Sequence, residues 1–263
     1  MKADYKNWMP KGMIAGTFVG AIISCILYAI VKMSSIIKEP TLKKIVSGAL
    51  FALSIILFPV TIWMILLYKA FSYKGKRQMS KQIIEGVARY VDIPDGGKGL
   101  DVGCGSGALT IACAKRNPKA KIIGIDRWGV EYSSFSEELC RNNAMAEEVD
   151  NVTFLHGDAT RLLYDDETFD AVTSNYVYHN IPSSDRQAIL LETLRTLKKG
   201  GCFAIHDIMS KIKYGDMEAF AQKLRDMGYE EVRLIDTTKG MFMSPFEALW
   251  MGLSGSTILV GRK

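Results

Sequence analysis

Two long runs of uncharged, mostly apolar residues lie near the start of the chain, over residues 12–31 and 45–68. A helix rises about 1.5 Å per residue and needs roughly 20 such residues to cross about 30 Å of hydrocarbon. Both runs are long enough, so we predict two transmembrane helices. The link from Lys32 to Lys44 is short and polar. It therefore predicts an antiparallel hairpin with both chain ends on the same side of the membrane.

Cations are distributed unevenly around the two runs. Four lysines lie in the link, whereas eight cations flank the hairpin: Lys2, Lys6, Lys11, Lys69, Lys74, Lys76, Arg77 and Lys81. Because cytoplasmic loops carry an excess of Lys and Arg, we expect an integral membrane protein with both termini and the following domain in the cytoplasm. A cleaved signal peptide has a shorter apolar core. Residues 22–25 loosely resemble a lipoprotein cleavage box, but Cys25 lies in the middle of the first run.

Glycine recurs every four residues in the first run, at Gly12, Gly16 and Gly20. These positions would form one smooth stripe on a helix, where another backbone can approach closely. The stripe predicts packing within the hairpin, or a homodimer formed through the same three glycines.

After the hairpin, the pattern changes to short apolar segments that alternate with amphipathic ones. Strands are expected at 99–102, 121–125, 152–155, 169–172, 202–205, 231–236 and 256–261. Helices are expected at 80–91, 108–115, 184–198 and 215–227. Strands that alternate with helices predict an α/β domain. We therefore divide the chain into a membrane anchor over 1–75 and an α/β domain over 76–263.

Composition and charge exclude several classes of protein. The formal net charge of +5 belongs to the N-terminal quarter, because from Gln82 onward 21 cations face 26 acids. That balance argues against a nucleic-acid partner. With 48% hydrophobic residues the chain is not disordered, and its five cysteines show no CxxC spacing. We therefore expect reduced thiols rather than a disulfide scaffold.

A glycine-rich segment follows the first expected strand and precedes a helix. Asp101 leads into Gly103, Gly105 and Gly107, and the second strand ends at Asp126, 19 residues after Gly107. Glycines without a Cβ let the backbone turn sharply and let a nucleotide approach the helix N-terminus. An acid at the end of the second strand suits ribose hydroxyls. Taken alone, the glycines also fit the dinucleotide-binding pattern of a nucleotide-dependent oxidoreductase.

Three further features favour a different cofactor. Asp101 precedes the glycines, Gly157-Asp158-Ala159 follows the third expected strand, and Phe169-Asp170-Ala171-Val172 leads into the fourth. Together these motifs resemble the class I S-adenosylmethionine-dependent methyltransferases, particularly the group that includes quinone C-methyltransferases. The resemblance covers about Ser80 to Arg262. It implies a Rossmann-like domain with a seven-stranded sheet, and S-adenosyl-L-methionine as the cofactor.

The resemblance also implies roles for individual residues. Asp101 would bind the methionine ammonium directly or through water, Asp126 the ribose, and Asp158 the adenine amino group. The remaining expected cofactor-binding residues are Gly103, Gly105, Gly107, Arg127, Trp128, Ala159 and Asn175. Of these, Trp128 would stack on the adenine or pack within the domain, and Asn175 would line the methionine side.

The acceptor side is expected beyond the carboxyl ends of the fourth and fifth strands, where open α/β sheets bind ligands. His179 is the first candidate general base, and His206 is the second. Tyr178 is a third candidate catalytic residue. Each could instead be a polar residue that is hydrogen-bonded within the domain. The histidines lack the spacing of metal ligands, so no metal site is expected.

The segment from Met241 to Leu253 is rich in methionine and aromatic residues. It could form core, a lid over an apolar acceptor, or a surface that rests on the bilayer. About ten residues separate Tyr68 from the first helix of the domain, which keeps the domain near the membrane. We therefore predict methyl transfer to a small-molecule or lipid acceptor that is lipophilic or membrane-associated. The alternatives are a non-catalytic cofactor-binding scaffold and, less favoured, a nucleotide-dependent oxidoreductase.

Overall fold

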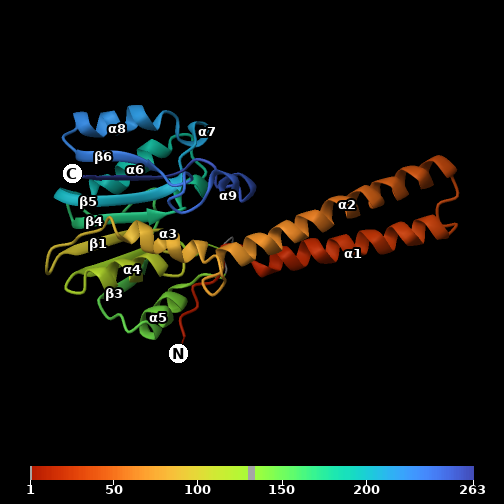
Figure 1. The fold of residues 1–263 in the computed structure, drawn as a ribbon, viewed down its shortest axis with the longest axis horizontal. Coiled ribbons are helices and arrows are strands. Elements are labelled where there is room, and N and C mark those ends of the chain that lie inside the picture. Colours follow the sequence, from red (N-terminus) through yellow and green to blue (C-terminus); the bar gives the residue numbers. More distant parts are fainter. Residues whose placement is uncertain (1, 130–133) are drawn as a thin grey trace. The chain divides into compact units, whose positions relative to one another are not determined.

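The computed structural model describes residues 2–129 and 134–263 of the 263-residue chain. The chain divides into two compact units, which are shown as ribbons in Figure 1. One unit is a helical hairpin over Asn7–Ser80. The other is an α/β domain that consists of Lys81–Lys263 and the N-terminal segment up to Lys6.

The hairpin contains α1 (Lys11–Met33) and α2 (Pro40–Phe71). Thr17 near the start of α1 lies 3.6 Å from the Met64 sulfur near the end of α2. Farther along, the rings of Tyr28 and Phe51 lie 5.3 Å apart. Because early residues of α1 meet late residues of α2, the two helices run antiparallel.

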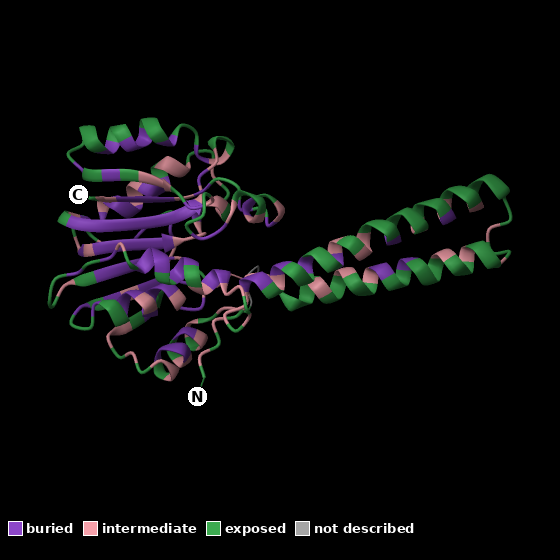
Figure 2. Cartoon of the chain, viewed as in Figure 1, coloured by how far each residue is buried: buried purple, intermediate pink, exposed green. Residues whose placement is uncertain are grey.

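Both helices are longer than the apolar runs that predicted them. The Glu39 carboxylate caps α2 by accepting hydrogen bonds from the Thr41 and Leu42 amides, so the helix starts at Pro40. Each helix is long and apolar enough to cross a membrane. Most residues of the two helices are exposed (Figure 2). A core helix of a soluble protein would instead be mostly buried.

The glycine stripe of α1 contacts α2 at one position only among the described residues. A Cβ at Gly20 would lie 3.4 Å from Leu57, whereas nothing lies within 4 Å of one at Gly12 or Gly16. Packing within the hairpin thus involves Gly20, and a homodimer through the stripe stays a prediction.

The domain is built on one seven-stranded mixed sheet in the order β3-β2-β1-β4-β5-β7-β6. Its strands are β1 (Lys98–Val102), β2 (Lys121–Asp126), β3 (Val152–His156), β4 (Phe169–Asn175), β5 (Leu197–Ile208), β6 (Glu230–Asp236) and β7 (Ser256–Arg262). The first five strands are parallel, and β7 runs antiparallel to both β5 and β6. This arrangement confirms the predicted α/β domain and its seven strands.

Helices cover the sheet, as Figure 1 shows. They are α3 (Met79–Ala88), α4 (Ala108–Arg116), α5 (Glu137–Ala146), α6 (Arg186–Arg195), α7 (Lys211–Tyr214), α8 (Met217–Asp226) and α9 (Pro245–Trp250), with a 3₁₀ turn, η2, at Tyr178–Asn180. Buried residues lie on the strands and on the helices that pack against them (Figure 2). The larger core cluster includes Leu100, Phe169 and Phe203, and a smaller one surrounds Phe154.

Two local predictions were wrong in extent. The fifth strand begins at Leu197 rather than at Cys202, and α6 correspondingly ends at Arg195. Gly200 has a φ of +78°, and the pairing with β4 shifts register between Phe169 and Ala171. Gly200 and Gly201 therefore form an irregularity inside β5, just beyond the expected end of the helix at residue 198.

Candidate active site

The glycine loop between β1 and α4 contains three glycines in a left-handed backbone conformation. Gly103, Gly105 and Gly107 have φ values of +75°, +56° and +81°, which L side chains rarely adopt. A Cβ at Gly103 would also lie 2.3 Å from Val177. At Gly105 the nearest atoms among the described residues would be carbons of Phe135 at 3.8 Å, which is ordinary van der Waals contact. The loop is therefore a cradle of the kind that a nucleotide needs.

Asp126, at the carboxyl end of β2, holds this loop in place. Its carboxylate accepts hydrogen bonds from the Gly105 amide at 2.9 Å and the Trp128 amide at 2.8 Å. The Trp128 indole in turn donates to the Gly105 carbonyl at 2.9 Å. Three residues thus form a closed network, and each carboxylate oxygen of Asp126 keeps a lone pair for a further donor.

The Trp128 ring packs against the smaller core cluster, which includes Cys104 and Phe154. This contact matches the alternative of packing within the domain. Arg127 is exposed, and its charge acts on Asp158.

Asp101 lies beneath the loop rather than at its surface. Its side chain is buried, and its two oxygens accept hydrogen bonds from the hydroxyls of Thr110 at 2.6 Å and Thr173 at 3.0 Å. Burial raises the pKa of Asp101 to about 6, although the two threonines oppose that shift. Asp101 therefore joins β1, α4 and β4 directly under the cradle.

Asp158 follows β3 and therefore lies, like Asp126, at the carboxyl ends of the strands. One of its oxygens accepts hydrogen bonds from the amide and hydroxyl of Thr160. Burial acts to raise the pKa of Asp158, but these hydrogen bonds and the charge of Arg127 leave it below its usual value. Ala159 is buried beside it. Asp158 thus caps a turn, while its second oxygen makes no hydrogen bond within the described residues.

His206 lies on β5 and is fully buried. Its Nδ1 lies 2.8 Å from the side-chain oxygen of Asn175, and its Nε2 lies 3.1 Å from the Thr237 hydroxyl. Burial lowers the pKa of His206 to about 3, so the ring is neutral at pH 7. With both nitrogens engaged, this imidazole is poorly placed to take a proton from an acceptor. Its contacts match the alternative of a polar residue bonded within the domain.

Tyr178 is also fully buried, in the larger core cluster. Its hydroxyl lies 2.7 Å from that of Thr193. Burial raises the pKa of Tyr178 well above its usual value, so the phenol stays protonated. These contacts favour a role in packing.

His179, by contrast, remains partly exposed and is paired with a carboxylate. Its Nδ1 lies 2.5 Å from Asp207 Oδ1, and its backbone amide donates to Asp207 Oδ2 at 3.1 Å. The His179 side chain is 13% exposed and the Asp207 side chain is fully buried. Burial acts to raise the pKa of Asp207, but the hydrogen bond and charge of His179 outweigh it and lower that pKa. An imidazole that donates from Nδ1 to a carboxylate presents Nε2 as a proton acceptor.

Arg186 fixes the turn that carries His179. Its guanidinium donates to the carbonyls of Tyr178, Ile181, Ser183 and Lys213 at 3.0–3.1 Å. The side chain thereby ties η2 to the last turn of α7. Sequence reasoning did not find this role, since its acceptors are backbone carbonyls that carry no sequence signal.

Aromatic rings line the region next to the His179–Asp207 pair. The Tyr176 ring lies 4.6 Å from that of His206 and 6.0 Å from that of His179. The Phe242 ring lies 5.6 Å from that of His206. Tyr176 has a φ of +55°, an uncommon backbone conformation for a tyrosine at the end of a strand. Aromatic rings therefore lie beside both histidines.

The N-terminal segment contacts the cofactor side of the domain. The buried amide of Asn143 on α5 accepts a hydrogen bond from the Asp4 amide at 2.7 Å and donates to the Asp4 carbonyl at 3.1 Å. The same amide donates to the Ser106 carbonyl in the glycine loop at 2.9 Å. Asn143 thus connects the chain just before the hairpin with the cradle.

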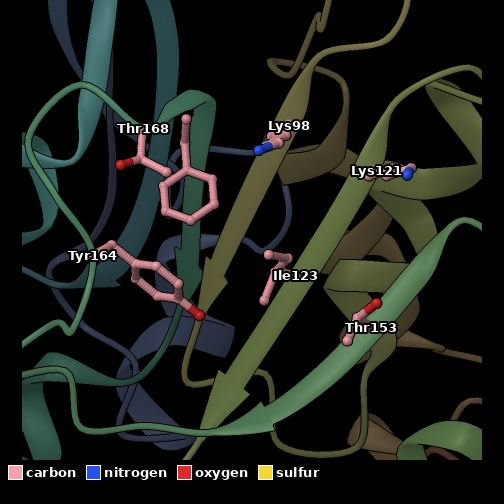
Figure 3. Close-up of a pocket in the computed structure, with 7 residues that line it drawn as sticks. Lys98, Lys121, Ile123, Thr153, Tyr164 and Thr168 are labelled. Carbon is pink, nitrogen blue, oxygen red and sulfur yellow. The ribbon is translucent and has the colours of Figure 1, made fainter.

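A hollow of about 250 Å³ lies elsewhere, between Tyr164 and the first residues of β1 and β2. Figure 3 shows Lys98 and Lys121 beside it. These lysines begin their strands, so the hollow is at the amino ends. Ligands in open α/β sheets bind at the carboxyl ends. We therefore do not place the active site there.

The comparisons with known proteins agree with this arrangement. A family model described as a methyltransferase domain matches residues 93–233, more than half of the 263-residue chain. The chain belongs to this methyltransferase domain family. The predicted resemblance is thereby confirmed at the level of the domain.

Curated relatives cover part of the chain. The demethylmenaquinone methyltransferase of Bacillus subtilis (strain 168) is 31% identical over 144 residues, which are 54% of this chain and 59% of that protein. The chain spans about half the length of the curated relatives that it matches, from 45% to 59%.

Solved structures share the fold. Geranyl diphosphate C-methyltransferase from Streptomyces coelicolor A3(2) superimposes with a TM-score of 0.55 at 12% identity, over 74% of this chain and 83% of that one. The cyclase SpnF superimposes with a TM-score of 0.54 at 21% identity, over 71% and 82%. At these identities the likeness shows the fold alone, and that fold carries more than one activity.

Proposed function

We propose that the protein is an S-adenosylmethionine-dependent methyltransferase that acts on a lipophilic, membrane-associated acceptor of the quinone or phenol class. The observation that carries this proposal is the glycine cradle braced by Asp126, next to a partly exposed His179–Asp207 pair. Val177 connects the two, since it packs on Gly103 and directly precedes the turn of His179. The relatives named for demethylmenaquinone support the class of acceptor.

The carboxyl ends of four adjacent strands provide the cofactor side. Asp126 would accept the ribose hydroxyls, Asp158 the adenine amino group beside the Ala159 backbone, and Gly105 would let the cofactor approach the loop. Asp101 would act on the methionine ammonium through its charge from beneath the loop, because its carboxylate is buried. Asn175 would line the methionine side, while Arg127 and Trp128 would border the adenine.

The chemistry depends on a base and on exclusion of water. When bound, S-adenosylmethionine supplies an electrophilic methyl group on a sulfonium. His179 Nε2 would accept the hydroxyl proton of a phenol or hydroquinone, which makes the acceptor a better nucleophile. Asp207 would hold the imidazole and stabilise its charge once protonated. Tyr176 and Phe242 would align an apolar ring and keep water away from it.

The first prediction tests the ribose-binding role. Asp126→Ala removes an acceptor and also frees the Gly105 amide of the cradle. An unsatisfied group of this kind costs about 1–3 kcal/mol, so calorimetry should show a loss of S-adenosylmethionine affinity of roughly ten- to hundredfold. Asp150→Ala is the matched control, because Asp150 is exposed and lies outside the site. Unchanged affinity in Asp126→Ala would refute the assignment.

Turnover separates the proposal from its alternatives. The wild-type protein should form S-adenosylhomocysteine when it is supplied with a demethylated menaquinol. A scaffold would bind the cofactor without turnover on any lipophilic acceptor, and an oxidoreductase would bind a nicotinamide or flavin dinucleotide instead. Either result would replace the proposed activity.

We also propose that α1 and α2 anchor the protein in a membrane, with the domain and both termini in the cytoplasm. Support comes from the length and exposed apolar surface of both helices and from the excess of cations on the flanks. A cysteine introduced at Ser35, in the link, should react with an impermeant thiol reagent in whole cells. One introduced at Ser72 should not. The reverse pattern would place the domain away from cytoplasmic cofactor and contradict the proposal.

A further inference from the structure

The domain exposes a group of large apolar side chains on α7, on α9 and just before α9. We call this group the apolar patch: Ile212, Met241, Phe246 and Leu249, which are 98%, 45%, 74% and 71% exposed. Single exposed apolar residues are ordinary on a protein surface, but a group of them marks an interaction site.

The backbone presents the patch on ordered structure. Within residues 241–253, Phe242, Met243, Ala248, Met251 and Leu253 are buried and fix the segment to the core. Ser244 and Glu247 form a reciprocal capping box at the start of α9. The segment is therefore neither wholly core nor a free lid, because one side is anchored and the other is exposed.

The two parts of the patch are joined through the backbone. The Met209 amide, two residues before α7, donates to the Gly255 carbonyl at 2.9 Å. Gly255 follows α9 closely, and a Cβ on it would lie 3.5 Å from Ser210. Figure 1 likewise shows α7 and α9 at the same end of the sheet. The contacts place both short helices on one edge of the domain.

Cations accompany the patch. Lys211 and Lys213 flank Ile212, and neither forms an ion pair within the described residues. Lys239 lies just before Met241 and contacts Asp236 at 3.2 Å. Glu247, the acid in α9, is held by the capping box. Apolar side chains flanked by lysines are typical of surfaces that bind anionic lipid bilayers.

The patch is also connected to the candidate acceptor side. Arg186 joins the Lys213 carbonyl of α7 to the turn that carries His179. Phe242, next to Met241, contacts the His206 ring. The elements that carry the patch therefore contact the elements that carry His179 and His206.

Chain length favours the bilayer as the occupant. Seven residues separate the end of α2 at Phe71 from the start of α3 at Met79. A fully extended chain spans at most about 3.3–3.6 Å per residue, so this tether reaches about 25 Å. If α2 crosses a membrane, the domain always remains close to its surface.

We propose that the apolar patch docks onto the bilayer that holds the hairpin, so that the acceptor enters the site from the lipid without crossing water. Docking rests on the proposed anchor and not on methyl-transfer activity, whereas the entry of the acceptor rests on the proposed function. Ile212, Phe246 and Leu249 enter the headgroup region, and Lys211 and Lys213 contact anionic headgroups.

The test uses the full-length chain with Cys25→Ser, since the other four cysteines are buried. A polarity-sensitive thiol probe is attached at Leu249→Cys, or at Lys223→Cys on the exposed side of α8 as the matched control. Vesicles contain neutral lipid alone or neutral with anionic lipid, and a fraction carries brominated acyl chains as quenchers. Flotation reports on the anchor, and quenching reports on docking.

If the patch docks, the emission of the probe at position 249 should shift to the blue. Brominated lipids should quench that emission at least about threefold more than the emission of the probe at position 223. In anionic vesicles, Lys211→Glu with Lys213→Glu should lower that quenching at least about twofold while flotation is unchanged. Equal quenching at 249 and 223 in floating protein would refute docking and leave the anchor standing. Protein that does not float would refute both.

A second copy of the chain is the competing occupant. In that case the probe at position 249 would be shielded from water in detergent, and the shielding would increase with protein concentration. Brominated lipids would not quench its fluorescence. That result would also overturn the proposal.

Discussion

Replacing His179 by alanine is expected to lower turnover by about 10²–10⁴-fold, the range that general-base catalysis contributes. The imidazole is the one partly exposed proton acceptor that the described structure pairs with a buried carboxylate on the acceptor side. S-adenosylmethionine affinity should change by less than about twofold, because the side chain lies outside the cradle. Single-turnover rates and calorimetry measure the two quantities separately.

Asp207→Asn distinguishes a base held by a carboxylate from a histidine that only packs. The amide keeps the size of Asp207 but cannot stabilise the imidazolium, so turnover should fall by about tenfold or more and its pH profile should shift. His156→Gln is the control, because His156 is an exposed histidine at the end of β3. If His179→Ala retained the wild-type rate at all pH values, methyl transfer would need no base and the assignment would fail.

The cofactor side could be predicted because its determinants are local in sequence. Gly103, Gly105 and Gly107 lie in one loop, and Asp126 ends the next strand. Parallel pairing of β1 with β2 then brings the carboxylate to the Gly105 amide. What the sequence could not give was the burial of Asp101, since the two threonines that enclose it come from α4 and β4.

The acceptor side was harder to predict, and alternation along β5 explains why. His206 and Asp207 are neighbours in sequence, but they contact different partners. Successive side chains of a strand point to opposite faces. His206 accordingly contacts Asn175 and Thr237, whereas Asp207 contacts His179, 28 residues away. The pairing depends on the β4–β5 register, which one sequence does not specify.

Helix α9 was missed although its signal is present. Ser244, Pro245 and Glu247 have the spacing of a capping box with proline at the first helical position. The run of methionine and aromatic residues obscured it, because an apolar run alone does not distinguish core from surface. Burial in the structure separates Phe242 and Met243 from Phe246 and Leu249. That separation is what makes the apolar patch visible.

Gly103→Ala is expected to destabilise the domain and abolish measurable cofactor binding. The left-handed backbone at φ +75° costs about 1–2 kcal/mol for an L residue. Overpacking against Val177, whose methyl carbons would lie 2.3 and 2.6 Å from the new Cβ, adds about 1–3 kcal/mol. The free energy of unfolding should therefore fall by about 2–5 kcal/mol in total, which chemical denaturation can measure. Relief of the clash would move Val177 and so disturb both the cradle and the turn of His179.

Gly96→Ala is the matched control, because it measures the cost of the left-handed backbone conformation without a steric clash. Gly96 has a φ of +78°, and nothing lies within 4 Å of an added Cβ among the described residues. The free energy of unfolding of the Gly96→Ala variant should fall by about 1–2 kcal/mol, and its cofactor affinity should be unchanged. Val177→Ala removes both close methyl groups, so adding it to Gly103→Ala should restore part of the stability and binding. If Gly103→Ala lost no more stability and no more cofactor affinity than Gly96→Ala, the contact with Val177 would not contribute to either. The cradle and the His179 turn would then not be coupled through Val177.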